Sequence, residues 1–294
     1  MTIAGLYLSP EGIVLGADST SSVPGPHGYH YFNHGQKIFE IGEGSTLGIL
    51  TWGMGGLGPV SYRALVALLA DELQRSPATS VADAAEKWIS IFWPAFSAYP
   101  EVIAGMALHG KPPHDPADAA SVVNRSVDEE QQYQAMRRDL GVGFCIAGYV
   151  LPGRNPHAVT IVFQVGELRP TPVPTRQHDV EWWGMQNVMN RLIYGVDDDG
   201  VAALMSTGKW SGTQQELVQA LSARPMLPRA HLPIRDAIDY VHAGIYCTIK
   251  AMKFSNLPQV CGGPIELAVI TADRKFRWVR HKSWDAAIID GERP

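Results

Sequence analysis

The sequence predicts an α+β layered domain, and three observations support this prediction. Apolar runs of strand length occur near the beginning, middle and end of the chain, and segments with helical spacing of apolar residues separate them. This order of strands, helices, strands, helices and strands differs from the strict alternation of a βαβ array. The 294 residues are 46% hydrophobic, and no internal repeat or composition boundary divides them. We therefore predict a single domain that spans residues 1–294.

The first eighteen residues have the pattern of a β-hairpin. Apolar runs at 3–8 and 13–17 flank a Ser-Pro-Glu-Gly turn, and the second run ends at Asp18. Because a hairpin brings its two ends together, we expect Asp18 to lie beside Thr2. The following segment, 19–35, is polar and rich in Gly and Pro, which predicts a loop.

Two strands and two helices are predicted next. Residues 37–41 and 47–52 have strand character, and a glycine-dense segment, 53–58, follows the second strand. Pro59 suits the first turn of a helix that ends near Ser76 and Pro77. Ser80 is then the expected N-cap of a second helix, which runs to about Phe96.

The second half of the chain begins with its least regular part, residues 101–140. We interpret this part as an insertion with a loop at 111–116 and an exposed polar helix at 128–139. The Asp-rich run 197–200 lacks the spacing of a calcium-binding loop and predicts a turn that ends a helix. The remaining pattern predicts strands at 142–149, 158–165, 180–184, 264–271 and 276–279, and helices at about 186–194, 213–223 and 234–252.

Charge and cysteine content limit the expected partners and compartment. The net charge of −5 gives no basis for a nucleic-acid or anionic-membrane surface. No apolar run approaches the roughly 20 residues of a membrane span, and no signal peptide is recognisable. The three cysteines, Cys145, Cys247 and Cys261, lack CxxC spacing, so we expect free thiols in a reducing compartment. We therefore predict a cytoplasmic protein without nucleic-acid or membrane partners.

Five segments together resemble the proteasome β-subunit family of N-terminal nucleophile (Ntn) hydrolases. Thr2 and Asp18 are 18 − 2 = 16 positions apart, which is the spacing of the nucleophile and the aspartate in that family. The other similar segments are the lysine-bearing strand 37–41, the strand and glycine turn 47–58, the hairpin 143–148 with 158–166, and the strand Cys-Gly-Gly-Pro-Ile-Glu-Leu at 261–267 with its continuation to 271. The resemblance implies a four-layer α/β/β/α sandwich, in which two antiparallel sheets are flanked by helices.

The resemblance also implies a mechanism and a set of site residues. Thr2 would become the N-terminal nucleophile after removal of Met1, and its own α-amine, which titrates near pH 8, would act as the base. Lys37 would lower the cost of forming the alkoxide, Asp18 would pair with Lys37, and the N–H of Gly53 would face the oxyanion. The substrate-binding wall would include Ser21, Gly35, Thr51 and Gly55. The function implied is a threonine-type peptidase that acts through an acyl-enzyme, with a peptide or protein substrate, a homo-oligomeric ring and an unfoldase or activator partner.

Two departures from the family pattern keep alternative functions open. The family serine that supports the threonine amine is expected near residues 183–186, where the sequence reads Trp-Gly-Met-Gln. The second family aspartate is expected within 253–260, a segment without a carboxylate. A non-catalytic structural subunit and a small-molecule amidase on the same fold are therefore the alternatives.

No metal or cofactor is predicted. His27, His30 and His34 are surrounded by Gly and Pro, which favours a loop with solvent-facing imidazoles over a metal site. The glycine-dense segment 53–58 is not a phosphate loop, since no Lys-Ser or Lys-Thr pair follows it. Cys261 follows an apolar approach without a neighbouring histidine, which favours an inert thiol over a nucleophile.

Overall fold

The computed structural model describes residues 2–25, 28–118, 121–175, 180–222, 231–256 and 258–285. The chain has a mixed α+β structure whose paired strands are antiparallel. It forms two compact units that are interleaved along the sequence. The first unit comprises Met1–Gly35, His178–Val269 and Trp278–Pro294; the second comprises Gln36–Gln177 and Ile270–Arg277.

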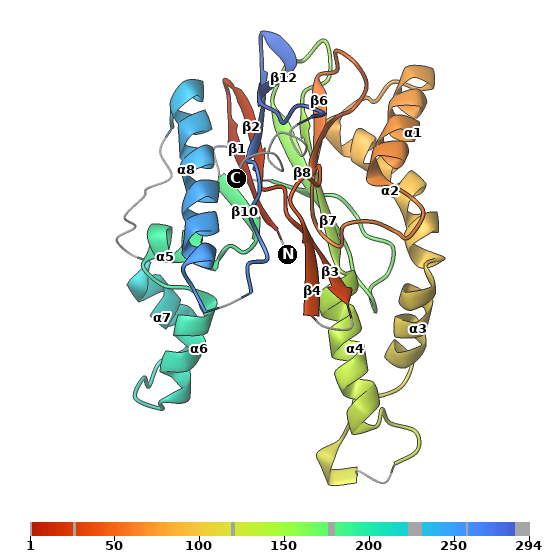
Figure 1. Cartoon of the computed structure of the whole chain (residues 1–294), viewed down its shortest axis with the longest axis vertical. Helices are drawn as coiled ribbons and strands as arrows, with labels where there is room; N and C mark the ends of the chain where they lie inside the picture. The colour runs from red at the N-terminus through yellow and green to blue at the C-terminus, as the bar shows by residue number, and fades with distance from the viewer. Residues whose placement is uncertain are drawn as a thin grey trace. The chain divides into compact units, whose positions relative to one another are not determined.

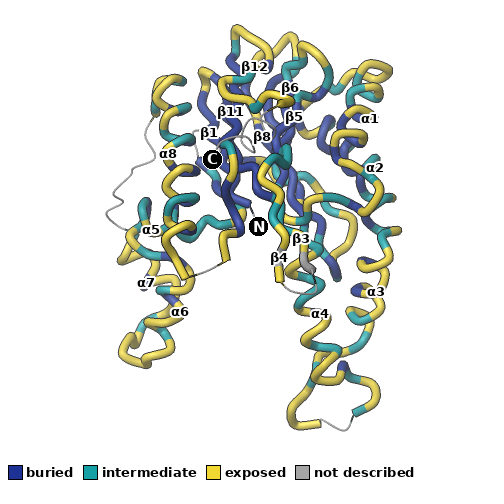
Figure 2. Tube along the Cα trace, in the orientation of Figure 1, coloured by how far each residue is buried: buried dark blue, intermediate teal, exposed yellow. Residues whose placement is uncertain are grey.

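The N-terminal hairpin lies in a five-stranded sheet. Strands β1 (Ile3–Ser9) and β2 (Gly12–Ala17) pair from Ala4↔Ala17 to Ser9↔Gly12, which confirms the predicted hairpin. Every residue of both strands is buried, as the dark tube in Figure 2 shows. The strand order of the sheet is β10-β1-β2-β11-β12, where the added strands are β10 (Val180–Gly184), β11 (Glu266–Thr271) and β12 (Arg274–Arg280).

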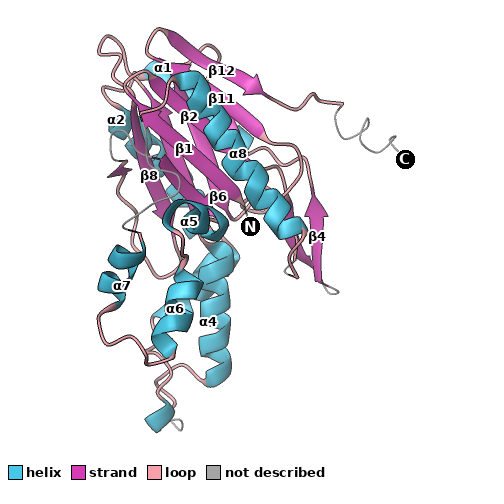
Figure 3. Cartoon of the chain, turned by 90° about the vertical axis from the view of Figure 1, so that its left-hand side faces the viewer, coloured by secondary structure: helices cyan, strands magenta, loops and turns pink. Residues whose placement is uncertain are grey.

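Helix α8 (Ile234–Lys253) packs on one face of this hairpin (Figure 3). A Cβ on Gly16 would lie 2.5 Å from Val241, so the absence of a side chain there lets the helix approach closely. Apolar residues of the opposite face, Leu6 and Leu15 among them, are also fully buried. The remaining helices of the unit are α5 (Asn187–Tyr194), α6 (Asp198–Ser206) and α7 (Gln214–Leu221).

The sequence-based prediction was wrong for two segments of the first unit. Part of the predicted loop 19–35 forms a separate two-stranded sheet, β3 (Ser21–Gly25) and β4 (Gly28–Phe32). Gly and Pro in this segment had suggested a loop, but Pro24, Gly25 and Gly28 lie within the two strands. Asp197 begins a helix instead of ending one, because its carboxylate accepts the N–H of Gly200 as the N-cap of α6.

The second unit is built on another five-stranded antiparallel sheet. Helices α1 (Tyr62–Arg75) and α2 (Val81–Ser97) belong to it, and α2 packs on β7 and β8 (Figure 1). Ser80 caps α2 as predicted, since its hydroxyl accepts the N–H of Asp83. The strand order is β5 (Ile38–Glu40), β6 (Leu47–Gly53), β7 (Val142–Gly148), β8 (His157–Phe163) and β9 (Val173–Pro174).

Residues 101–140 are more regular than predicted. Helix α3 (Pro100–His109) was missed, whereas the polar helix α4 (Val127–Leu140) confirms the prediction for 128–139. The two helices contact each other, and a short 3-10 turn (Pro116–Asp118) lies in the connection between them. No single helix among the described residues is long and apolar enough to cross a membrane; α2 and α3 pass that test only as a pair, with an 82° bend between them.

Candidate functional site

Thr2 and Asp18 lie side by side at the open end of the N-terminal hairpin. Thr2 immediately precedes β1 and Asp18 immediately follows β2. The N–H of Asp18 donates to the carbonyl of Ile3 at 3.1 Å, and the N–H of Ile3 donates to Asp18 Oδ1 at 3.1 Å. The hairpin thus brings the hydroxyl-bearing residue and the carboxylate together, as the apolar pattern predicts.

The carboxylate of Asp18 is fully buried and held by backbone donors. Besides Ile3, it accepts the N–H of Thr20 at 3.1 Å and the N–H of Gly262 at 2.9 Å, both on Oδ2. These backbone donors satisfy both carboxylate oxygens and so offset the cost of burying a polar group. Gly262 belongs to the Cys-Gly-Gly segment that precedes β11, and the position of this segment beside Asp18 was not predicted from the sequence. These bonds give Asp18 one fixed orientation.

The backbone on the other side of Thr2 is formed by Gly184 and Met185. Ile3 pairs with Gly184 in the register of β1 and β10, and the N–H of Met185 donates to the carbonyl of Thr2 at 2.8 Å. Gly184 has φ +82°, and a Cβ there would lie 1.8 Å from that carbonyl oxygen. Only glycine satisfies both conditions. Thr2 itself is 3% exposed.

Ser21 and Gly35, two of the predicted substrate-binding residues, also belong to the first unit. The N–H of Gly35 donates to the carbonyl of Ser19 at 2.9 Å. A Cβ on Gly35 would lie 2.5 Å from Ser21 Oγ, so these two residues are in direct contact. Ser21 starts β3, and this contact ties the beginning of the β3–β4 hairpin to the segment that follows it.

The other predicted site residues, Lys37, Thr51, Gly53 and Gly55, belong to the second unit. Lys37 is 6% exposed, and its carbonyl accepts the N–H of Thr51 at 2.9 Å. The Thr51 hydroxyl donates to the carbonyl of Gly143 at 3.1 Å, so this side chain is engaged within the sheet. Gly55 is exposed in the turn after β6.

Gly53 ends β6 in a conformation that requires glycine. Its φ is +85°, and a Cβ there would lie 2.3 Å from the carbonyl oxygen of Gly141. In a strand, the N–H groups of residues two positions apart point to the same side. Because the N–H of Thr51 points to Lys37, the N–H of Gly53 points to the same edge of the sheet, beyond the first residue of β5.

One ionic cluster, linked to the residue after Asp18, was not predicted from the sequence. Its members are Glu266, at the start of β11, and Lys282, after β12. Glu266 is fully buried, and Lys282 Nζ lies 3.1 Å from its Oε2. Lysine and glutamate at strand ends are usually solvated, so no local pattern distinguishes this pair from surface charges.

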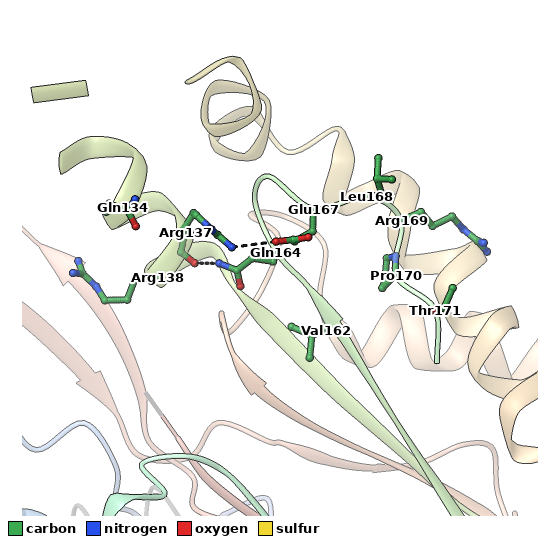
Figure 4. Close-up of a pocket in the computed structure, with 10 residues that line it drawn as sticks. All are labelled: Gln134, Arg137, Arg138, Val162, Gln164, Glu167, Leu168, Arg169, Pro170 and Thr171. Atoms are coloured by element: carbon green, nitrogen blue, oxygen red, sulfur yellow. Dashed lines mark hydrogen bonds and ion pairs between the residues drawn. The ribbon is translucent and has the colours of Figure 1, made fainter. Parts of the chain in front are cut away.

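A groove of about 810 Å³ occurs elsewhere, in the second unit (Figure 4). None of the predicted site residues lines it. Its three arginines are each paired with a carboxylate: Arg137 with Glu167 at 3.2 Å, Arg138 with Asp139 at 2.9 Å, and Arg169 with Glu86 at 3.4 Å. The groove therefore presents little uncompensated charge, and we assign it no ligand.

Metal ligands and thiols do not form a second site. Within the described ranges, no three or more His, Cys, Asp or Glu side chains could hold a metal ion together. Of the three histidines weighed as ligands, His30 lies in β4 and His34 in the segment after it, while His27 lies outside the described residues. Cys145 and Cys261 are buried, Cys247 is exposed, and none of the three is in a disulfide.

No family model matches this sequence, and no curated protein matches it. Among solved structures, the chain is similar to the Gly-1 mutant of Anbu from Hyphomicrobium sp. strain MC1, with 12% identity, 99% of this chain and 93% of that chain covered, and a TM-score of 0.49. It is also similar to Anbu (ancestral beta-subunit) from Yersinia bercovieri, with 10% identity, 98% and 92% covered, and a TM-score of 0.44.

These comparisons correct the family suggested by the sequence motifs. The motifs had indicated the threonine-type proteasome β-subunit family, but no family model matches and the two solved structures named above are Anbu proteins. Short motifs in the right order can arise from shared backbone geometry, such as glycines at positive φ, without shared membership of one family. The assignment to the threonine-type proteasome β-subunit family is therefore wrong, and the relation that is found is a structural similarity to Anbu.

Proposed function

We propose that this protein is a threonine-type amide hydrolase that cleaves peptide bonds with Thr2 after removal of Met1. The observation that supports this function best is the pair formed by Thr2 and the buried carboxylate of Asp18, joined by the bond from Ile3 N–H to Asp18 Oδ1 at 3.1 Å. Removal of one residue would place a hydroxyl, a free amine and this carboxylate in one small volume. That combination is the equipment of an N-terminal nucleophile.

The reaction proceeds in two steps. The α-amine of Thr2 takes the proton of its own hydroxyl, Oγ1 attacks the peptide carbonyl, and the C–N bond breaks as the amine passes the proton to the leaving group. Water then hydrolyses the resulting ester and releases the acid. An α-amine with a pKa near 8 is partly unprotonated at neutral pH, which suits it to the role of a base.

Lys37 and Gly53 supply the electrostatic part of the proposed site. Lys37 stabilises the alkoxide, Asp18 orients Lys37, and the N–H of Gly53 donates to the oxyanion, a contact worth about 3 kcal/mol in other hydrolases. Two features support this assignment. First, Gly53 N–H and Lys37 share one edge of the second sheet. Second, only Gln36 separates Lys37 from Gly35, whose N–H donates a hydrogen bond to the carbonyl of Ser19, the residue after Asp18.

The four-layer α/β/β/α arrangement also stays a proposal, and the burial of both faces of each sheet supports it. In the first sheet Leu6 and Leu15, on the face away from α8, are 0% exposed. In the second sheet Leu50 and Cys145, on the face away from α2, are 0% exposed as well. Within this arrangement Ser21, Gly35, Thr51 and Gly55 form the substrate-binding wall. The ring-shaped homo-oligomer and the unfoldase or activator partner are further predictions.

Intact-mass spectrometry before and after treatment with a threonine-directed epoxyketone tests the proposal. We expect loss of Met1 and addition of one inhibitor to the wild type, with neither inhibitor addition nor turnover of fluorogenic peptide amides in Thr2→Ala. The matched control is Thr207→Ala, which removes an exposed threonine and should react as the wild type does. Retained Met1, or unchanged turnover by Thr2→Ala, would refute the assignment.

A non-catalytic subunit is the second candidate, and one observation favours it. The backbone beside Thr2 is Gly184-Met185, and neither residue has a hydroxyl that could hold the amine of Thr2. In that case Met1 stays on the protein, and Thr2→Ala changes neither mass labelling nor hydrolysis. A small-molecule amidase would instead label at Thr2 and discriminate poorly among peptides.

A further inference from the structure

Glu266, Lys282 and their partners form a polar cluster that is connected to Asp18 through Ser19 and Gly262. The carboxylate of Glu266 is fully buried, with His281 Nδ1 at 2.7 Å from Oε1 and Lys282 Nζ at 3.1 Å from Oε2. The Lys282 side chain is only 9% exposed. Burying two charges is costly unless both are paired and hydrogen-bonded. This pair therefore differs from an ordinary surface salt bridge, whose partners remain in water.

The ammonium group of Lys282 also binds two residues that flank the proposed site. Nζ donates to Ser19 Oγ at 3.0 Å and to the carbonyl of Gly35 at 3.0 Å. Ser19 follows Asp18 in the sequence, and Gly35 precedes Lys37 by two residues. Of the three N–H donors of the ammonium group, two thus serve the Ser19 hydroxyl and the Gly35 carbonyl, while Glu266 contributes an ion pair at 3.1 Å.

The same two residues are tied to the backbone that holds Asp18. Ser19 N–H donates to the carbonyl of Gly262 at 2.9 Å, and Gly262 N–H donates to Asp18 Oδ2 at 2.9 Å. The Ser19 hydroxyl donates to the carbonyl of Pro264 at 2.6 Å, and Gly35 N–H donates to the carbonyl of Ser19. The cluster and the Asp18 carboxylate thus share one hydrogen-bond network. A displacement of Ser19 would move a donor to Asp18.

We propose that Lys282, held by Glu266, is a positioning residue of the site: it fixes Ser19 and Gly35, and through them the orientation of Asp18 and the path of the chain into Lys37. This inference rests on the proposed function for its catalytic consequence. Lys282 follows β12 and is 282 − 18 = 264 positions from Asp18 in the sequence. The proposal therefore assigns a role in the site to a residue that is distant from it in sequence.

The test compares Lys282→Met, which removes the charge but keeps the length, with Lys282→Arg as the conservative rescue. The matched control is Lys275→Met, which removes an exposed lysine of β12. For folded Lys282→Met we expect kcat on peptide amides to fall on the order of tenfold to a hundredfold, the size expected for a small misplacement, while KM changes little. The rate of epoxyketone labelling of Thr2 should fall in parallel, and Lys282→Arg should recover part of both.

Hydrogen exchange separates this proposal from the proposed function. We expect faster exchange at the amides of Ile3, Thr20 and Gly262, the donors to Asp18, in Lys282→Met but not in Lys275→Met. Unchanged exchange at these amides would overturn the positioning role, whether or not the enzyme is active. Faster exchange with unchanged kcat and labelling would also overturn it, since the pair would then serve stability alone. A wild type that neither labels nor hydrolyses would refute the proposed function, while the exchange result would still decide whether Lys282 orders Asp18.

The double variant Glu266→Gln with Lys282→Met covers the case in which the single variant fails to fold. Removing both charges avoids leaving a buried carboxylate without its lysine, so the melting temperature should recover relative to Lys282→Met. We expect the low kcat to persist, because Ser19 and Gly35 still lack their donor. Recovery of kcat together with stability would overturn the proposal.

Discussion

At the scale of single residues, Gly184 controls the position of Thr2 more directly than any side chain. Its positive φ turns the chain at the end of β10, and its missing Cβ leaves room for the carbonyl oxygen of Thr2. That oxygen is thereby free to accept the N–H of Met185. The backbone of Thr2 is therefore fixed from both sides, by β10 on one and by the bond between Ile3 and Asp18 on the other.

We expect Gly184→Ala to destabilise the protein by about 1–3 kcal/mol from backbone strain, with a further cost from the clash with Thr2. Gly195→Ala is the matched control, because Gly195 has φ +77° and open space around its Cβ position. Urea unfolding of both variants measures the two free energies of unfolding. The difference between the two losses of unfolding free energy isolates the cost of the clash with the Thr2 carbonyl. Equal losses in Gly184→Ala and Gly195→Ala would mean that this clash costs nothing.

At the scale of elements, the connection from α3 to α4 is organised by one buried arginine. Arg125 is 5% exposed, donates to the carbonyls of Leu108 and Lys111, and pairs with Glu130 at 2.6 Å. Its guanidinium also lies 4.3 Å from the ring centroid of Tyr133. The hydrogen bonds from the Gln134 and Arg125 side chains lower the pKa of Glu130 to about 2. The ionised form of Glu130 is thus the one that holds this connection.

The lowered pKa of Glu130 predicts a pH dependence for α4. A carboxylate with a folded-state pKa below its unfolded value of 4.5 stabilises the structure above pH 4.5, and this stability is lost as the pH falls toward 2. Hydrogen exchange within α4 should therefore speed up, relative to β7, as the pH falls from 4.5 to about 2. Glu130→Gln should show weaker protection of α4 than the wild type above pH 4.5 and a smaller pH step, the remainder coming from Glu129, whose pKa the hydrogen bond from Lys111 also lowers. Glu43→Gln, an exposed carboxylate in the same unit, is the control and should keep the step.

Elements with local signals were predictable from the sequence, whereas those without such signals were not. The N-terminal hairpin has apolar runs around a Pro-Glu turn, and α2 has a serine cap and apolar spacing, so both were found. Helix α3 lacks a side-chain cap and is apolar around much of its surface, which hides the helical period. In the candidate site, Thr2 and Asp18 could be paired because one hairpin joins them. The role of Lys282 could not be predicted, because Ser19 lies near the other end of the chain and no predicted hairpin joins the two residues.

At the scale of the whole molecule, the sequence interleaves the two units. The chain passes from one unit to the other after Gly35, Gln177, Val269 and Arg277. Strand β11 begins in the first unit and ends in the second, so unfolding of either unit would break this strand. A strand is stable only with its neighbours, which makes independent unfolding of either unit costly. We therefore expect one cooperative transition for the chain.

Phe92→Ala tests this cooperativity from within the second unit. Phe92 is fully buried, with ring centroids of Phe144 and Phe163 at 4.7 and 4.6 Å, so its truncation should cost about 3–5 kcal/mol through lost burial and a residual cavity. If the units unfold together, the slowest amides of β1 and β2 in the first unit should lose the same free energy, and melting should remain a single transition at a lower temperature. Phe254→Ala, at a side chain that is 79% exposed, should leave both unchanged. Wild-type protection of β1 and β2 in Phe92→Ala, or a second melting step, would instead show that the shared strand β11 does not couple the two units.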